Sequence, residues 1–115
     1  MPERQVENTI PVLAVRSLEV SIAFYKEVLG FEVGWNAGHI CSVSRDGCSI
    51  MLQQREAAGN GTVWIGPDGD TLISSAEKSG ARILQPPTNN PWAYDMSISD
   101  PDGNVLWLGA EPKGH

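Results

Sequence analysis

Four tryptophans carry the most evident chemistry of this 115-residue chain. Indole rings bind flat molecules by stacking and attract cations to their faces. The chain also has 14 acidic and 8 basic residues, and its formal net charge of -6 attracts cations at long range. Together, the rings and the charge predict a surface that binds flat, cationic, heteroaromatic molecules. The tryptophans are Trp35, Trp64, Trp92 and Trp107.

Residues for metal or nucleophilic chemistry are scarce. The two histidines are His39, in a Gly-flanked turn, and His115, the last residue, and both are expected to be solvated surface residues. No Ser or Cys lies in a motif with either histidine. Cys41 and Cys48 form no Cys-x-x-Cys pair and are expected to behave as small buried apolar residues. We therefore predict no catalytic residue, no metal ligand and no cofactor.

Composition limits the class of protein and its partners. A chain of this length with 41% apolar residues is expected to form one compact domain. Its negative charge repels phosphate backbones and anionic lipid, so we expect no nucleic-acid or membrane partner. The first five residues lack the basic and apolar regions of a secretory signal, and no apolar run approaches the roughly 20 residues of a membrane helix. The prediction is a soluble, cytoplasmic protein.

A short motif occurs twice in the chain. Residues 46–52 and residues 102–108 share the pattern Asp-Gly-x-x-aliphatic-x-Leu. The Asp46-Gly47 dipeptide favours a two-residue turn, which would place Arg45 opposite Cys48 in a hairpin. A repeat of this kind indicates two similar halves, and two halves imply a cleft between them.

The first half predicts the order strand, helix and three strands. The Ser17 side chain can cap the start of the helix, and Gly30 suits its C-terminal end. Between them, apolar residues recur at helical spacing from Leu18 to Leu29. The predicted elements are a buried strand over 10–15, the helix, a strand over 31–35, and a hairpin of 40–44 with 48–53.

The second half repeats that order less clearly. Asp68 or Asp70 is expected to cap a helix that ends at Ser79-Gly80. Residues 85–91, rich in proline and asparagine, are expected to form a loop, and residues 55–61 to link the halves. The predicted strands cover 62–65, 81–84, 94–99 and 104–108. Module 1 would then span about 8–54 and module 2 about 62–111 of the single domain, 1–115.

Alternation separates two faces of the hairpins. One face is apolar and is expected to lie under the helix; it carries Cys41, Val43, Cys48, Ile50 and Leu52. The other face is too polar for a dry core and too aromatic for simple exposure, so it predicts a ligand groove. This mixed face comprises Ser42, Ser44, Ser49, Met51 and Gln53 in the first hairpin, and Ser97, Ser99, Val105 and Trp107 in the second.

Three segments of the chain are typical of a known family: IPVLAVRSL at 10–18, FYKEVLGF at 24–31, and Pro91-Trp92 followed by DPDGN at 100–104. With them the sequence resembles the vicinal oxygen chelate superfamily, which includes glyoxalase I, extradiol dioxygenases, fosfomycin-resistance enzymes and bleomycin-resistance proteins. The Pro-Val-Leu opening and the Pro-Trp element look most like the bleomycin-resistance branch. The resemblance covers nearly the whole chain. It implies an α+β fold in which two tandem βαβββ modules form a curved mixed sheet around a cleft.

Enzymes of this superfamily usually bind a divalent metal through His and Glu side chains on the first and last strands of the modules. Carried onto this sequence, those positions hold Ile10, Met51 and Trp107, with the fourth among residues 62–64. None of these side chains replaces imidazole or carboxylate as a metal ligand. The resemblance therefore implies the fold without its metal centre.

Pro11 allows two interpretations. Proline is ordinary at the start of a strand. In the bleomycin-resistance branch, however, the matching proline is a hinge that sends the first strand to the partner subunit, and the grooves form at the dimer interface. The resemblance thus implies a homodimer and leaves open whether the arm is exchanged. Related proteins often carry Gly and then Arg after Pro-Trp, whereas this chain has Ala93-Tyr94-Asp95, which changes the charge near the groove.

The leading hypothesis is a metal-free binding protein that sequesters a cationic, aromatic antibiotic of the bleomycin type and so confers drug resistance. The alternatives are a glyoxalase-like lyase or isomerase, or a dioxygenase, with an atypical metal site, and a groove that serves a peptide or another subunit. Enzymatic activity is thus left open. The predicted ligand-binding residues are Trp35, Ile40, Ser42, Met51, Gln53, Trp64, Trp92, Tyr94, Ser97 and Trp107.

Overall fold

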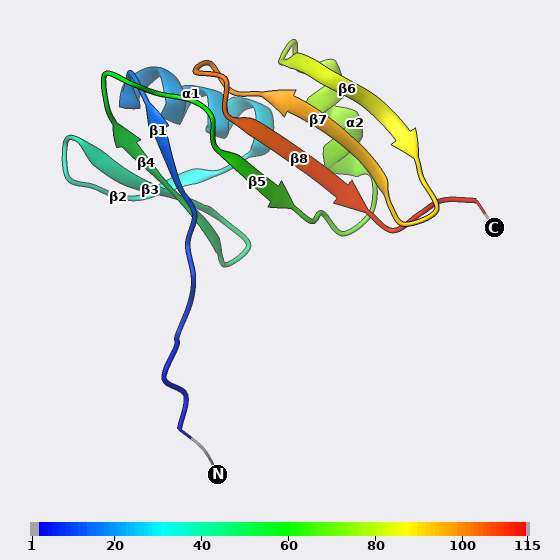
Figure 1. The fold of residues 1–115 in the computed structure, drawn as a ribbon, viewed down its shortest axis with the longest axis horizontal. Coiled ribbons are helices and arrows are strands. Elements are labelled where there is room, and N and C mark those ends of the chain that lie inside the picture. The colour runs from blue at the N-terminus through cyan, green and yellow to red at the C-terminus, as the bar shows by residue number, and fades with distance from the viewer. Residues whose placement is uncertain (1–2, 115) are drawn as a thin grey trace.

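The computed structural model describes residues 3–114, which form two βαβββ modules in chain order (Figure 1). The first module contains β1 (Val12–Val15), α1 (Leu18–Leu29), β2 (Glu32–Asn36), β3 (Ile40–Arg45) and β4 (Cys48–Gln54). The second contains β5 (Thr62–Ile65), α2 (Thr71–Lys78), β6 (Arg82–Asn89), β7 (Tyr94–Ser99) and β8 (Val105–Ala110). The predicted α+β fold of tandem modules is confirmed.

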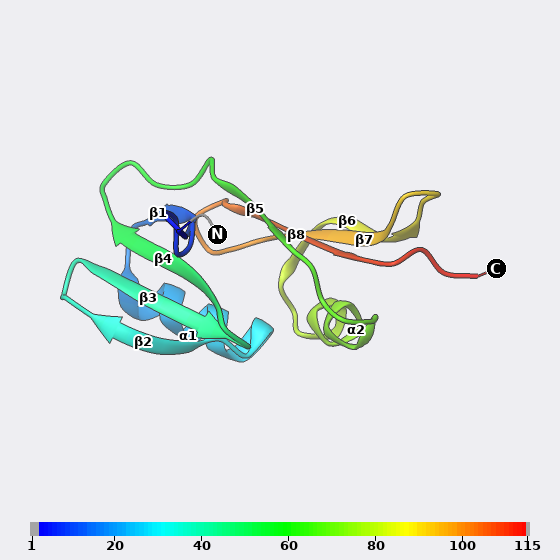
Figure 2. The same ribbon diagram turned by 90° about the horizontal axis from the view of Figure 1, so that it is seen from below.

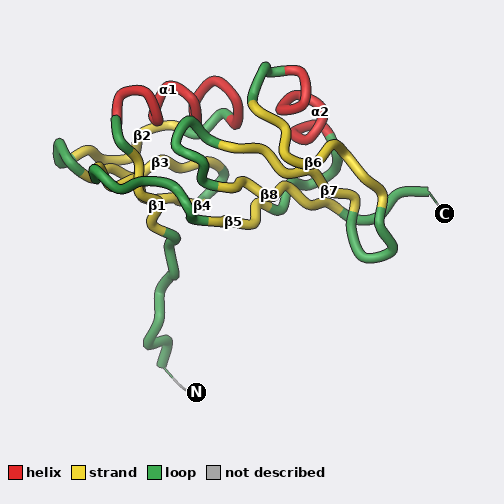
Figure 3. The backbone as a smooth tube through the Cα atoms, turned by 45° about the horizontal axis from the view of Figure 1, so that its top comes forward, coloured by secondary structure: helices red, strands yellow, loops and turns green. Residues whose placement is uncertain are grey.

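Each module builds a four-stranded mixed sheet. The strand orders are β1-β4-β3-β2 and β5-β8-β7-β6, and in each sheet the first strand runs parallel to the last. Figure 2 shows the two sheets beside each other, and Figure 3 shows both helices on the same side of the sheets. The outer edge of β1 is occupied, because the Ala14 carbonyl accepts the Gly59 N–H and the Asn104 Nδ2–H. The curved mixed sheet is observed as two four-stranded sheets.

Helix α1 begins and ends where the sequence predicts. Ser17 Oγ accepts the backbone N–H of Val20 at 3.2 Å, and Gly30 has a φ of 71°, the left-handed conformation that glycine adopts without steric cost. The buried face of the helix lies against the apolar face of the first sheet. Both contribute to one hydrophobic core that continues into the second module: Leu13, Val15, Leu18, Tyr25, Leu29, Phe31, Cys41, Val43, Ile50, Leu52, Ile73, Ala76, Met96, Ile98, Leu106 and Leu108.

A buried hydrogen-bond cluster joins the two modules behind this core. The Asp100 carboxylate accepts the Tyr25 hydroxyl of α1 at 2.9 Å, the backbone N–H groups of Asp102 and Asn104, and Asn104 Nδ2 at 2.9 Å. Desolvation of the phenol, followed by the nearby Asp100 charge, raises the pKa of Tyr25 well above its ordinary value. The DPDGN segment therefore acts as a structural joint.

The strands differ from the predicted ranges at two places. β1 begins at Val12, so Ile10 and Pro11 precede it, and residues 3–9 extend away from both sheets (Figure 1). The prediction of a loop over residues 85–91 is wrong for its first part, because β6 continues through Pro86 and Pro87 to Asn89. β6 is an outer strand, where the missing proline N–H costs no ladder hydrogen bond, and its pairing with β7 shifts register twice.

At the start of α2, the predicted N-cap position is confirmed, but the expected capping hydrogen bond is absent. Asp70 occupies the predicted N-cap position, but its side chain makes no capping hydrogen bond. The carboxylate instead forms an ion pair with Lys113 of the C-terminal segment. Because this pair is exposed, solvent screens it and it contributes little to stability.

The prediction that both cysteines are buried is right for Cys41 and wrong for Cys48. The hairpin register is the predicted one, with Cys48 opposite Arg45 and Cys41 opposite Leu52. Cys48, however, directly follows the Asp46-Gly47 turn, at an end of the hairpin that solvent reaches. Position along the strand, and not the choice of face, decides the exposure of this thiol.

The two thiols should therefore differ in reactivity. A water-soluble maleimide or disulfide reagent is expected to modify Cys48 in the folded protein and Cys41 only after denaturation. Burial raises the pKa of the Cys41 thiol and lowers its thiolate fraction, in addition to blocking access. Mass spectrometry of the labelled protein measures the outcome. A Cys48→Ser variant serves as the control, and rapid labelling of that variant under native conditions would contradict the assignment.

Candidate ligand-binding face

The open face of the second sheet carries an aromatic row. Trp64 of β5 pairs in register with Trp107 of β8, which pairs with Ser97 of β7, and Ser97 in turn with Gln85 of β6. Residues paired in this way share one face of a sheet. The intervening residues of β5 and β8, such as Val63 and Leu106, belong to the core or pack against it. Alternation along these strands thus directs the row away from the core.

Trp92, in the β6–β7 loop, completes a cluster of three tryptophans with Trp64 and Trp107. The Trp107 ring lies edge-to-face with Trp64, with centroids 4.8 Å apart and planes at 82°. It makes a similar contact with Trp92 at 6.0 Å and 83°. Trp64 is 47% exposed and Trp92 is 61% exposed, although both are large apolar side chains. This tryptophan cluster therefore leaves indole surface available for a flat ligand.

Asp95 lies beneath the tryptophan cluster. Its side chain accepts Trp107 Nε1–H at 2.9 Å, Gln85 Nε2–H at 2.9 Å and Asn90 Nδ2–H at 3.0 Å. Asp95 is only 1% exposed, and its hydrogen bond sets the orientation of the Trp107 indole. Asp95 is not among the site residues predicted from the sequence. Its spacing of two from Ser97 on the same strand places it on the open face and could have revealed it.

The Trp64 ring lies directly against the backbone of Gly109. A Cβ atom at this position would overlap with the six-membered ring of Trp64. The indole therefore packs directly on the backbone of β8, two residues beyond Trp107 on the same face. Only glycine permits this close approach of a ring to a strand.

The open face of the first sheet is a second surface with different chemistry. Met51 pairs with Ser42 and Val12, and Gln53 pairs with Ile40, so these side chains share that face. A register shift between Val33 and Trp35 places Trp35 opposite Ser42, and Trp35 is 44% exposed. The face combines apolar side chains with hydroxyl and amide groups. The predicted members on it are Trp35, Ile40, Ser42, Met51 and Gln53.

The structure does not bring all ten predicted residues together. The five on the first sheet and the second-sheet group of Trp64, Trp92, Ser97 and Trp107 lie on separate sheets. Tyr94 packs on the core side of β7, under the Lys113 ammonium at 4.2 Å from its ring centroid. A groove of about 810 Å³ between the β3–β4 turn and the start of α2 is lined by Trp64 but by no other predicted residue.

The positions that hold metals in related enzymes do not suit a metal in this chain. Ile10 precedes β1, and Met51 and Trp107 offer a thioether and an indole instead of imidazole or carboxylate. Within residues 3–114, no three His, Cys, Asp or Glu side chains are grouped so that they could hold an ion. His39 is exposed, and His115 lies outside the described residues.

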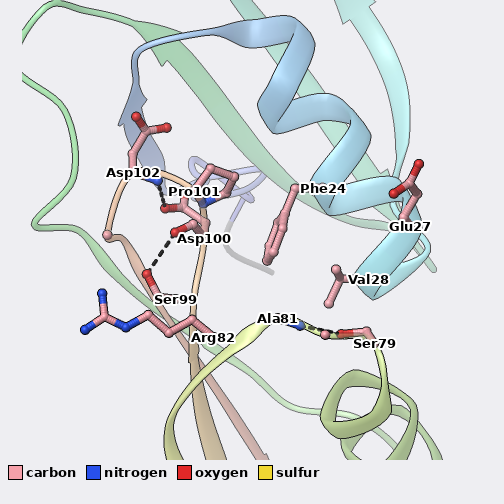
Figure 4. A pocket seen from close by; sticks show the side chains of 12 residues that line it. Phe24, Glu27, Val28, Ser79, Ala81, Arg82, Ser99, Asp100, Pro101 and Asp102 are labelled. Atoms are coloured by element: carbon pink, nitrogen blue, oxygen red, sulfur yellow. Dashed lines mark hydrogen bonds between the residues drawn. The ribbon is translucent and has the colours of Figure 1, made fainter.

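A second hollow lies on the helix side, away from the tryptophan cluster. Figure 4 shows Phe24 of α1 facing the turn that contains Asp100 and Pro101, while Val28 points toward Ser79 and Ala81. The polar groups of this turn bond within the chain, since Ser99 Oγ donates to the Asp100 carbonyl and the Asp102 N–H to the Asp100 carboxylate. This hollow belongs to the joint between the modules.

Length and hydropathy of the helices bear on a membrane location. Among the described residues, no helix is both long and apolar enough to cross a membrane.

Comparison with models of protein families identifies the family. The sequence model described as Glyoxalase/Bleomycin resistance protein/Dioxygenase superfamily matches residues 9–108. No curated protein matches the sequence.

Solved structures share the fold at low sequence identity. The antibiotic-binding protein TnmS3 from Streptomyces sp. CB03234 has a TM-score of 0.80 at 23% identity, covering 95% of this chain and 99% of its own. The bleomycin resistance determinant encoded on transposon Tn5 has a TM-score of 0.81 at 18% identity, covering 92% and 98%. TioX from Micromonospora sp. ML1 has a TM-score of 0.79 at 16% identity, covering 92% and 99%.

Proposed function

Since the chain belongs to the glyoxalase/bleomycin resistance protein/dioxygenase superfamily, we propose that it binds a flat, cationic small molecule without transforming it. The observation that carries this proposal is the exposed tryptophan cluster with a buried carboxylate beneath it. Indole faces stack on flat rings and attract cations, and the net charge of -6 steers cations to the protein. Sequestration requires tight binding and no reactive group.

The proposed biological role is resistance to an aromatic, cationic antibiotic of the bleomycin type. TnmS3 is described as an antibiotic-binding protein, and the Tn5 protein as a bleomycin resistance determinant. Both share this fold, which makes antibiotics the first ligands to test. Protection by sequestration would be stoichiometric, so it would scale with the amount of protein. We propose that the protein acts in the cytoplasm, where such a ligand meets its target.

We further propose that the site is completed in a homodimer. In one chain the two open faces carry exposed apolar side chains, with Val12 51% and Trp35 44% exposed on the first sheet. Apposition of this face to the tryptophan cluster of a second copy would cover both surfaces. Two-fold symmetry would then create two equal grooves. Residues 3–9, which extend away from the sheets (Figure 1), support this proposal because they would be accessible to a second copy.

Calorimetry with bleomycin and other aromatic, cationic antibiotics tests the binding role. We expect saturable binding, and Trp107→Ala should weaken it about tenfold or more, because stacking and cation–π contacts are each worth on the order of 1 kcal/mol. Val20→Ala, on the exposed side of α1, is the matched control and should bind normally. Sedimentation measures the proposed dimer.

Two results would contradict this function. One is the absence of binding to any of these antibiotics together with normal growth inhibition of an expressing host. The other is one divalent metal ion per chain in protein purified without chelators, which would favour the competing enzyme hypothesis. A groove filled by polypeptide in a crystal would instead indicate a peptide or subunit as the natural occupant.

A further inference from the structure

Asp95 is a buried carboxylate whose polar contacts are all with neutral groups. Its three side-chain donors are an indole and two carboxamides. Among residues 3–114, the ion pairs involve Asp46, Asp70 and Asp102, and none involves Asp95. Both Asp95 oxygens accept from uncharged N–H donors, and no cationic side chain of the described residues forms an ion pair with this carboxylate.

A carboxylate that has only uncharged donors as partners attracts a cation that approaches the surface above it. Trp107 Nε1–H donates to Asp95 Oδ2, so the carboxylate lies next to an indole of the tryptophan cluster. A hydrogen bond from the indole N–H to an anion also increases the electron density of the indole ring, which strengthens the attraction of the ring for cations.

We propose that Asp95 determines the charge specificity of the tryptophan cluster, selecting organic cations with delocalised or quaternary charge over neutral aromatics of the same shape. This inference rests on the proposed binding function and names the residue that sets its ligand class. The indoles supply shape recognition for either kind of ligand. Asp95 adds a fixed negative charge close to the rings. Because this charge is buried, dissolved salt screens it less than it screens the exposed acidic residues.

The competing explanation is that Asp95 only holds the local structure. It fixes Trp107 and, through Asn90, the start of the loop that carries Trp92. A purely structural role would affect neutral and cationic ligands equally. Charge specificity would affect the cation alone.

A pair of isosteric probes separates these roles: 1-methylquinolinium, a cation, and 1-methylnaphthalene, its neutral counterpart. Binding is followed by NMR through the indole Nε1–H signals of Trp64, Trp92 and Trp107. We expect the native protein to prefer the cation by about tenfold, and to keep most of that preference in about 0.5 M salt. The Asp95→Asn variant should lose the preference while binding the neutral probe within about twofold of the native protein.

A second variant guards against local misfolding of Asp95→Asn. Trp107→Phe keeps the carboxylate and an aromatic ring but removes the indole N–H. It should bind both probes more weakly and still prefer the cation. Equal loss of both probes in Asp95→Asn, combined with no cation preference in Trp107→Phe, would assign Asp95 a structural role only.

The remaining outcomes are also decisive. Equal binding of the two probes by the native protein would overturn the charge specificity of Asp95 and leave the binding function intact. If neither the cationic nor the neutral probe shifts any of the three indole signals in the native protein, both proposals would be overturned.

Discussion

The Asp100→Ala variant is expected to lose about 3 to 5 kcal/mol of unfolding free energy. Removing the carboxylate leaves the Tyr25 hydroxyl, the Asn104 amide and two backbone N–H groups without their acceptor inside the protein. Asp100 is 4% exposed, so water replaces these hydrogen bonds poorly. Urea denaturation followed by tryptophan fluorescence measures the loss. A decrease below about 1 kcal/mol would contradict the role of Asp100 as the joint between the modules.

Tyr25→Phe is the matched control for this prediction, because it removes one of the hydrogen bonds and keeps the ring in the core. It should cost about 1 to 2 kcal/mol. It should also change the response to alkaline pH. The unfolded tyrosine ionises above about pH 10, whereas burial and the Asp100 charge keep the folded phenol protonated by raising its pKa. The contribution of Tyr25 is therefore fully present below about pH 10 and is lost above it, and the variant should lack this part of the decline.

Replacing Gly109 by alanine is expected to weaken binding of an aromatic cation about tenfold or more, with a stability change of about 1 kcal/mol or less. The added methyl group would occupy the space of the Trp64 ring, so the indole must leave the surface of β8. Trp64 is half exposed, and its side chain can rotate into solvent without opening the core. The tryptophan cluster would lose the Trp64 ring, while the strands of the sheet keep their register.

Gly34→Ala provides a comparison on the other sheet, because a Cβ there would meet its neighbours at ordinary contact distances, with Ser44 Oγ at 3.7 Å. This variant should leave the tryptophan cluster intact. Calorimetry and thermal unfolding of both variants give binding and stability separately. Normal ligand affinity in Gly109→Ala would contradict the assignment of Trp64 to the site.

Most of the fold could be predicted because its signals are local. The Ser17 cap and the Gly30 end of α1 depend on residues within one turn of the helix. The Asp46-Gly47 turn sets the β3–β4 register, and alternation then assigns Met51 and Ile50 to opposite faces. The prediction failed at β6, because a proline is tolerated in an outer strand and the sequence does not show which strand is outermost.

The candidate site could be predicted only in part. Alternation placed Trp107, Ser97, Met51 and Gln53 on open faces. The pairing of β5 with β8, which the sequence did not predict, places Trp64 beside Trp107. The sequence-based prediction included Tyr94 among these residues, although alternation from Ser97 assigns it to the core side.

The helix ends, the hairpin turn and the faces of most strands follow from the sequence, because each depends on neighbours a few residues apart, and the repeated motif indicates the two modules. How distant segments meet follows only from the packing of the strands. The contacts of Asp95 with Gln85, Asn90 and Trp107 depend on the pairing of β7 with its neighbours and on the β6–β7 loop, and the space above Gly109 is filled by Trp64 of another strand. These long-range contacts depend on strand packing, and they define the binding face.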